Sequence, residues 1–257
     1  MQALVPAGVG LFAGSTAAYL AALWTSKPGV LRAAHVLLGL TVLLWVGILA
    51  ASVPHLAEGG VTRFYLGGSA IGLSGLYLVL VRRYPIAGLG SFVSALATLL
   101  AVFAMFAQRQ NVTDPTLVDW LLRIHIALAF VGVTAFAFST ALSMVYLMQA
   151  RMLKQKAKTE LRRRLPPLDV LDRLALRGIV VGFPFYTVAL LLGSAQAIRT
   201  EHLRGSYVLA IISWVIYGVV LQARLTAGWR GRRAAILTIF GLILALSVVA
   251  QYGFRSV

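Results

Sequence analysis

The sequence predicts an all-α fold: a polytopic membrane bundle of eight transmembrane helices with both termini on the extracytoplasmic side. Three observations lead to this prediction. Of the 257 residues, 60% are hydrophobic and only 12% are charged, whereas soluble domains are typically about half apolar and about a quarter charged. The charges cluster between apolar runs of about 20 residues, the length of helix that crosses a bilayer core. Basic residues also concentrate in alternate connections between these runs, which indicates a membrane topology.

Gaps in hydropathy, together with proline, glycine and charged residues, delimit the expected spans. They lie at roughly 5–24, 33–52, 63–81, 86–107, 120–149, 178–198, 207–223 and 234–252. Within the sixth span, Gly178 and Gly182 should let a neighbouring helix approach closely. The start of the chain lacks the positively charged n-region of a secretory signal, so it is interpreted as a retained first span. No repeat or soluble domain is visible, and residues 1–257 are expected to form one domain.

The orientation follows from the basic residues. The connections after the first, third, fifth and seventh spans hold 17 of the 23 Lys and Arg residues. Because such residues are retained on the cytoplasmic side, these connections are predicted to be cytoplasmic, in the inner (cytoplasmic) membrane of a bacterium. The net charge of +16 is then explained by topology and by anionic lipid at the cytoplasmic face, without a nucleic-acid partner.

The connection at 151–177 is the only sizeable polar segment. It is strongly basic, and after Pro166-Pro167 its apolar residues, such as Leu171 and Leu174, recur at helical spacing. This pattern predicts a short amphipathic helix on the inner membrane surface, with Asp172 on its polar face. A docking surface for a soluble partner is the alternative interpretation of the same segment.

A second basic cluster stands in VLQARLTAGWRGRRAAIL, residues 220–237. It is predicted to be a cytoplasmic turn whose arginines, Arg224 among them, contact lipid phosphates, with Trp229 in the aromatic belt of the interface. The turn itself comprises Gly228, Trp229, Arg230, Gly231, Arg232 and Arg233.

Enzyme signatures are not recognisable in the sequence, so no catalysis is expected. No HExxH motif, phosphate-binding glycine loop or series of intramembrane carboxylates is present, and the chain has no cysteine. A disulfide, a thiolate ligand and a covalently attached haem are thereby excluded. Four histidines remain as candidates for binding a cofactor.

In the predicted topology three of these histidines gather near the outer face. His125 lies just inside the outer end of the fifth span, and His55 and His202 lie in outer connections. Two imidazoles can hold a haem iron from opposite sides, and only members of this trio could do so together, since His35 is expected at the cytoplasmic end of the second span. A structural hydrogen bond is an equally good interpretation of His125, and ordinary solvated or interfacial roles would account for the other three.

Three segments carry a resemblance to a known family: RIHIALAFVGVTAFAFSTALSMVYLMQARMLK (123–154), PPLDVLDRLALRGIVVGFPFYTVALLLGS (166–194) and SWVIYGVVLQARLTAGWRGRRAAILTIFGLILALSVVAQYGF (213–254). In order and spacing they resemble the cytochrome c assembly family of membrane proteins, which contains the CcsA, CcmC and HemX-like proteins. The most specific feature is a Trp-x-x-Tyr helix that leads into GWRGRRAA. The first four spans match the family only in hydropathy.

The resemblance implies particular site residues. The family's haem handlers carry a tryptophan-rich WD segment in an outer loop, flanked by haem-ligating histidines, and this segment is missing from IRTEHLRGSYVLAIISW (198–214). His125 matches the first flanking histidine. The second, expected beyond the last span, has no counterpart in YGFRSV, and Gln222 stands where many members have a histidine. These departures favour the HemX-like branch.

The resemblance also implies a function: an integral membrane factor that binds or presents haem at the outer face during cytochrome c biogenesis. The expected cofactor is non-covalent haem b, with its iron on His125. The second ligand would be His202 or, next, His55, and the propionates would lie near Arg123, Arg199 or Arg204. The alternative is a HemX-like regulator or scaffold for haem biosynthesis or a membrane complex, which would bind a cytochrome-assembly or haem-pathway protein through 151–177. A small-solute transporter is third, because intramembrane carboxylates and paired broken helices are lacking.

Overall fold

The computed structural model of the chain describes residues 4–25, 27–53, 61–84, 86–106, 117–155, 165–199 and 205–254. Within these ranges every regular element is helical, as predicted. The α-helices are α1 (Leu4–Thr25), α2 (Pro28–Ser52), α3 (Val61–Leu80), α4 (Gly90–Phe106), α5 (Leu117–Lys154), α7 (Leu168–Arg199), α8 (Gly205–Thr226) and α9 (Arg232–Phe254), and a short 3₁₀ helix, η2 (Ala87–Leu89), precedes α4. Each predicted span coincides with one of these α-helices.

Among the described residues, five helices are long and apolar enough to cross a membrane, which makes this a multi-pass membrane protein. They are α1, α2, residues Arg123–Lys154 of α5, residues Leu168–Ser194 of α7 and residues Tyr207–Thr226 of α8. In α3 and α4 the apolar stretches, Phe64–Leu80 and Gly90–Phe106, are shorter. The eight crossings and the side on which the termini lie therefore stay predictions.

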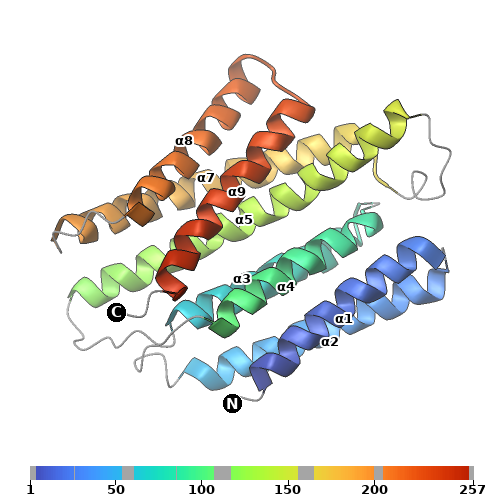
Figure 1. Cartoon of the computed structure of the whole chain (residues 1–257), viewed down its shortest axis with the longest axis horizontal. Helices are drawn as coiled ribbons and strands as arrows, with labels where there is room; N and C mark the ends of the chain where they lie inside the picture. The colour runs from blue at the N-terminus through green and yellow to red at the C-terminus, as the bar shows by residue number, and fades with distance from the viewer. Residues whose placement is uncertain are drawn as a thin grey trace.

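The helices pair into hairpins that lie side by side (Figure 1). In order across the molecule these are α1–α2, α3–α4, α5–α7 and α8–α9, and contacts of α1 with α4, α3 with α5, and α5 with α9 join one hairpin to the next. Helices are the natural choice here, since each satisfies its own backbone hydrogen bonds and lipid offers no replacement partners.

Large apolar side chains cover much of the outside of the bundle. Leu43 of α2 and Leu191 of α7 are each more than 60% exposed, while the interior contains small polar residues such as Ser15 and Thr41, whose hydroxyl oxygens are 3.4 Å apart. Exposed leucine costs little in contact with lipid tails, and small or hydroxyl-bearing residues favour close helix packing.

Close packing is most evident between α5 and α7. A Cβ at Gly132 of α5 would lie 3.1 Å from the backbone nitrogen of Tyr186, and one at Gly182 of α7 would lie 2.9 Å from the ring of Phe136. A Cβ at Gly178 would collide with the hydroxyl of Ser139. The predicted role of Gly178 and Gly182 in close helix contact is confirmed.

The segment after Pro166-Pro167 differs from its prediction. Residues 168–177 are not a separate surface helix but form the first turns of α7, which continues without a break to Arg199. Leu171 and Leu174 are buried in the core of the bundle. The predicted apolar stripe is real, but it packs against the other helices instead of the lipid surface.

Candidate functional site

His125 lies in the third turn of α5, where α7 passes close by. Its Nδ1 is 2.6 Å from the carbonyl oxygen of Ala189. A carbonyl oxygen can only accept a hydrogen bond, so in the neutral ring Nδ1 carries the proton and Nε2 has the lone pair. Gly193, one turn further along α7, leaves room for the ring, because a Cβ there would lie 2.8 Å from Cε1 of His125. Thus α7 holds this half-buried imidazole in one orientation.

Arg123 precedes His125 by two residues, and its side chain is partly exposed. The hydroxyl of Tyr65, near the start of α3, donates a hydrogen bond of 3.3 Å to the backbone carbonyl of Arg123. The Tyr65 ring also packs against Phe130, with 6.1 Å between the ring centroids. Three helices, α3, α5 and α7, therefore meet around His125.

The remaining residues predicted to bind haem, His55, His202 and Arg204, lie outside the described residues, as does the side chain of Arg199. A second histidine opposite His125 therefore stays a prediction. In the part of the chain that is described, no three His, Asp or Glu side chains gather into a metal site. A haem iron needs fewer protein ligands than a free metal ion, since the porphyrin nitrogens already bind it and the protein adds only one or two more.

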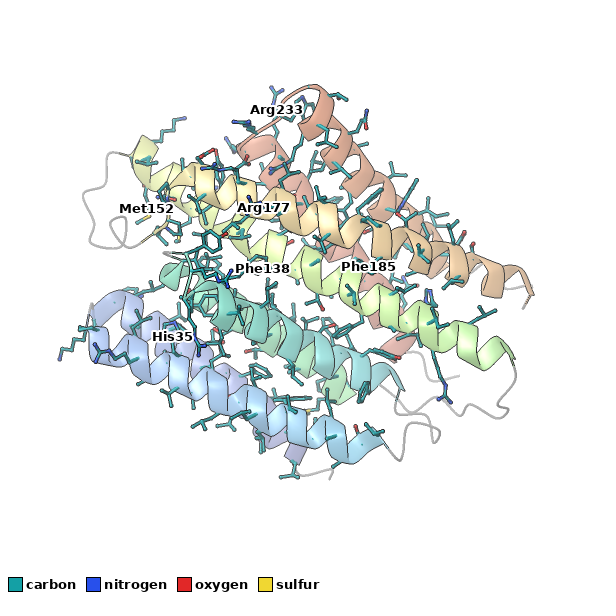
Figure 2. All side chains as sticks on the ribbon, turned by 180° about the vertical axis from the view of Figure 1, so that it is seen from behind. His35, Phe138, Met152, Arg177, Phe185 and Arg233 are labelled. Carbon is teal, nitrogen blue, oxygen red and sulfur yellow. The ribbon has the colours of Figure 1, made fainter. Side chains whose placement is uncertain are left out.

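His35 lies on α2, in the α1–α2 hairpin (Figure 2). Its ring stacks on that of Tyr77 at a centroid distance of 6.0 Å and meets the edge of Tyr19 at 5.4 Å. Tyr77 lies twelve residues after Tyr65 on α3, a separation of about 18 Å along a helix axis. His35 is thus far from the contacts of His125, and it belongs to a packed aromatic cluster.

The turn between α8 and α9 is built around a buried ion pair. Arg224, in the last turn of α8, has an Nη2 atom 3.0 Å from Oδ1 of Asp172 on α7. Its Nη1 donates a second bond, of 3.1 Å, to the backbone carbonyl of Asp172. The same carboxylate accepts a hydrogen bond of 3.3 Å from the backbone N–H of Gly231. One aspartate therefore ties α7 to both sides of the turn.

Two glycines in the turn have backbone conformations that other residues rarely adopt. The φ angles are 63° at Gly228 and 80° at Gly231, in the left-handed region that favours glycine. A Cβ at Gly231 would also lie 2.7 Å from the hydroxyl of Tyr146 on α5. The glycine spacing in GWRGRR thus follows from the shape of the turn and from its contact with α5.

The prediction that all arginines of this stretch contact lipid is wrong for Arg224. Its side chain is 2% exposed and Asp172, expected on a polar surface, is 12% exposed. A buried guanidinium needs a carboxylate partner, and α7 supplies one because its first turns lie inside the bundle. Arg230, Arg232 and Arg233 are exposed, and their contact with lipid stays a prediction.

The Trp-x-x-Tyr pair of α8 lies at the junction of four helices. Trp214 donates a hydrogen bond of 2.9 Å from Nε1 to the hydroxyl of Thr187 on α7. Tyr217 is fully buried, stacks on Phe136 of α5 with 3.6 Å between ring centroids, and donates to the carbonyl of Thr238 on α9. In contrast, Gln222 is exposed on α8.

Comparison with known proteins identifies relatives over most of these helices. The sequence model of the family described as "Cytochrome C assembly protein" matches residues 65–257. The chain is 27% identical over 168 residues to the cytochrome c biogenesis protein CcsA of Chlamydomonas reinhardtii, an alignment that covers 61% of this chain and 46% of the relative. It is 38% identical over 116 residues to CcsA of Heterosigma akashiwo, with 42% of this chain and 34% of the relative covered.

A third relative, CcsA of Gloeothece citriformis, is 35% identical over 89 residues, which is 32% of this chain and 26% of the relative. The chain thus spans less than half the length of each of these curated relatives. No solved structure matches the chain.

Proposed function

This chain belongs to the cytochrome c assembly protein family, and from that premise we propose that it is a membrane-embedded haem-handling factor of cytochrome c biogenesis. It would bind or present non-covalent haem b and would carry out no catalysis of its own. The family match over residues 65–257 and the relatives described as cytochrome c biogenesis proteins support the process. The arrangement of His125 supports the cofactor.

The observation that carries the proposal is the hydrogen bond between His125 and Ala189. Histidines that ligate metals usually donate their other ring N–H to a carbonyl or carboxylate, which selects the tautomer and orients the ring. His125 has this partner at 2.6 Å, and its Nε2 would be the axial ligand. A bound haem would supply an iron with an open coordination position, and Nε2 of His125 would donate its lone pair to that iron.

The rest of the haem site is proposed from the sequence. His202 is the first candidate for the second axial ligand and His55 the next, and Arg123, Arg199 or Arg204 would neutralise the propionates. Arg123 is a candidate because it lies at the same end of α5 as His125 and a guanidinium can bind a carboxylate in bidentate fashion.

The site would lie at the outer face of the membrane. Eight crossings, extracytoplasmic termini and a bacterial inner membrane would put the start of α5 and the end of α7 outside, and the basic turn 228–233 inside. The proposal is supported by the eight described α-helices, each of which overlaps one expected span, since this orientation requires eight crossings.

The visible spectrum of the full chain tests the haem proposal. We expect protein purified from haem-replete membranes to show a Soret band, and we expect His125→Ala to lose most of it, because the only oriented axial nitrogen on α5 is removed. His35→Ala is the matched control, since it removes a histidine at a distance from the site. A wild-type protein without a Soret band, or a band that His125→Ala leaves unchanged, would contradict the proposal.

A regulator or scaffold is the second candidate. It is favoured by the length of the α5–α7 hairpin: α5 has 38 residues, about 57 Å of helix, whereas the bilayer core is about 30 Å thick. Residues 168–177 of the segment 151–177 belong to α7, so the end of α5 and the chain up to residue 167 would make the contact with a cytochrome-assembly or haem-pathway protein outside the bilayer. If so, replacing residues 156–164 by a neutral linker of equal length should abolish co-purification of that protein and spare the haem spectrum.

A further inference from the structure

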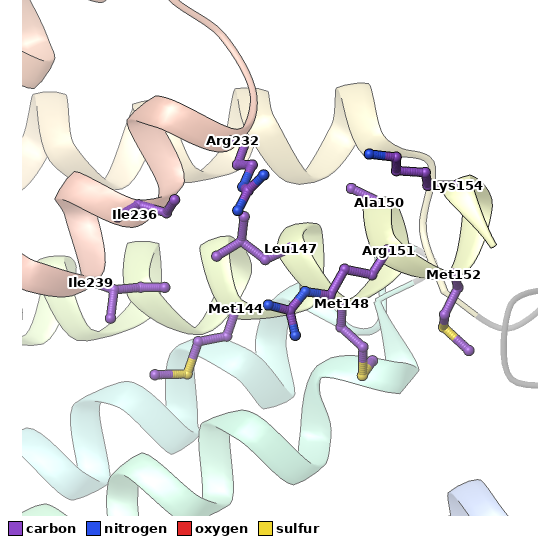
Figure 3. Close-up of a pocket in the computed structure, with 10 residues that line it drawn as sticks. All are labelled: Met144, Leu147, Met148, Ala150, Arg151, Met152, Lys154, Arg232, Ile236 and Ile239. Carbon is purple, nitrogen blue, oxygen red and sulfur yellow. The ribbon is translucent and has the colours of Figure 1, made fainter.

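A groove opens between α5 and α9 at the end of the bundle opposite His125. Its volume is about 710 Å³, within the range of sites that take small amphiphilic molecules. Figure 3 shows the side chains around it, which come from the last turns of α5 and the first turns of α9. The groove shares no residue with the candidate haem site.

The floor and walls of the groove are apolar. The apolar lining comes from both helices: Met144, Leu147 and Met148 belong to α5, and Ile236 and Ile239 belong to α9. Ile236 is 46% exposed, and the α9 side chains that follow on the same side, Phe240 and Ile243, are 52% and 54% exposed. The apolar surface therefore continues along the outside of α9 beyond the groove, in the direction that a lipid tail would take.

Three cations surround the same space. Arg151 and Lys154 belong to the end of α5, and Arg232 belongs to the start of α9. In Figure 3 the Arg232 side chain extends from α9 toward Leu147, and the Arg151 guanidinium of α5 lies between Met144 and Met148. No acidic residue lines the groove, and within the described ranges neither salt bridge involves these three residues. The site thus combines three positive charges with an apolar trough.

We propose that this groove binds one anionic phospholipid, with its phosphate among Arg151, Lys154 and Arg232 and an acyl chain along Met148 and Ile236. Basic pockets between transmembrane helices are suited to anionic headgroups. The side chains of Arg and Lys extend along apolar surface while their charged ends stay at the interface. A lipid also matches the position of the groove, which faces the outside of the bundle where the bilayer would be.

The bound lipid would join α9 to α5 at the end where the α8–α9 turn is already held by Asp172 and Arg224. The lipid would bridge the α5–α7 and α8–α9 hairpins. The groove would select lipids by headgroup charge, since its three cations favour an anionic over a zwitterionic headgroup. This inference is independent of haem binding.

Native mass spectrometry of the full chain from nanodiscs of equal parts phosphatidylglycerol and phosphatidylcholine tests the proposal. We expect wild-type protein to retain phosphatidylglycerol about tenfold over phosphatidylcholine, because the three cations attract a headgroup with a net negative charge more strongly than a zwitterionic one. The variant R151Q/K154Q/R232Q should lose this preference. The control K27Q/R82Q/R83Q removes three exposed cations that do not line the groove, and it should keep the preference.

A second variant separates a lipid from a phosphate ion. Ala150→Trp would fill part of the trough and leave all three cations in place, so it should weaken lipid retention. Displacement of the lipid by millimolar inorganic phosphate, or unchanged retention in Ala150→Trp, would show a phosphate site without an acyl chain and would overturn the proposal. Equal loss of the phosphatidylglycerol preference in R151Q/K154Q/R232Q and in K27Q/R82Q/R83Q would indicate non-specific attraction and would also overturn the proposal. The same holds if the visible spectrum shows a Soret band that is lost only in R151Q/K154Q/R232Q, because the groove would then bind haem.

Discussion

Asp172 and Arg224 join α7 to the end of α8 through an ion pair in which the arginine side chain is almost fully buried. The pair is supported by two further hydrogen bonds, one from the arginine to the Asp172 carbonyl and one from the N–H of Gly231 to the carboxylate. Removing one partner of such a pair leaves an uncompensated charge in the interior. This makes Asp172 a residue on which the stability of the turn depends.

We predict that Asp172→Asn lowers the free energy of unfolding by about 3 kcal/mol, measured by thermal unfolding in detergent. The matched control is Asp169→Asn. It breaks an ion pair with Arg173 whose two side chains are 61% and 65% exposed, and exposed pairs contribute about 0–1 kcal/mol. Equal effects of the two substitutions would show that Asp172 is not buried with Arg224.

Gly193 is the residue that sets the fit of the His125 ring against α7. We predict that Gly193→Ala reduces haem occupancy severalfold, because a Cβ 2.8 Å from Cε1 of His125 must displace the imidazole from its hydrogen bond. Gly218→Ala is the control, since its Cβ would meet only Phe183 at an ordinary 3.5 Å. The Soret absorbance per protein measures haem occupancy. Equal occupancy in Gly193→Ala and Gly218→Ala would show that haem binding does not depend on the position of the His125 ring against Gly193.

At the scale of elements, the contact of α5 with α7 positions both His125 and Asp172. The two helices approach so closely at Gly132 that an added Cβ would meet the backbone of Tyr186, at 3.1 Å from its nitrogen and 3.2 Å from its Cα. Backbone atoms cannot move aside as a flexible side chain can, so the helices themselves would have to separate.

We predict that Gly132→Ala costs about 1–3 kcal/mol through overpacking and also lowers haem occupancy. Gly47→Ala in α2 should have no effect or be slightly stabilising, because a Cβ there meets nothing within 4 Å and alanine is the better helix former. Thermal unfolding and the Soret band of the two variants check this. A Gly132→Ala protein as stable as the wild type would mean that the helices pack less closely than described.

At the scale of the whole molecule, the arrangement of hairpins puts the end of α5, the start of α7 and the α8–α9 turn together, as Asp172, Arg224 and Gly231 demonstrate. His125 lies with the opposite ends of α5 and α7. The two ends therefore differ in chemistry: one is rich in cations, and the other has an oriented imidazole.

The absence of cysteine permits a direct test of topology. We predict that Lys154→Cys and Arg230→Cys react with a membrane-impermeant maleimide only after the cells are permeabilised, whereas Gly205→Cys reacts in intact cells. All three positions are exposed, so accessibility should depend on the side of the membrane. If Lys154→Cys and Gly205→Cys react alike in intact cells, the predicted orientation fails.

Much of the fold could be predicted because its signals are local. A run of about 20 apolar residues must become a helix in lipid, and the charge clusters mark where each run ends. For this reason the eight expected segments coincide with the helices, and Gly178 and Gly182 were recognisable as packing residues. The family signature in GWRGRRAA was equally readable, since the glycines and arginines are adjacent in sequence.

The partner of Arg224 could not be predicted in this way. Asp172 stands 52 residues away, and neither hydropathy nor a count of charges says which side of a helix faces its neighbours. The same limit led to a surface location for residues 168–177, whose apolar stripe fits lipid and protein equally well. Likewise, a histidine near the end of a span gives no indication of which ring nitrogen is engaged.

The membrane class, the helical segments and the family are therefore readable from the amino-acid order, because they depend on the composition and order of neighbouring residues. Three features become visible only when the helices are packed together: Ala189 orients His125, Asp172 neutralises Arg224, and the cations of α5 and α9 surround one apolar groove. Each of these depends on which faces of distant helices meet, and that is settled by the packing of the whole bundle.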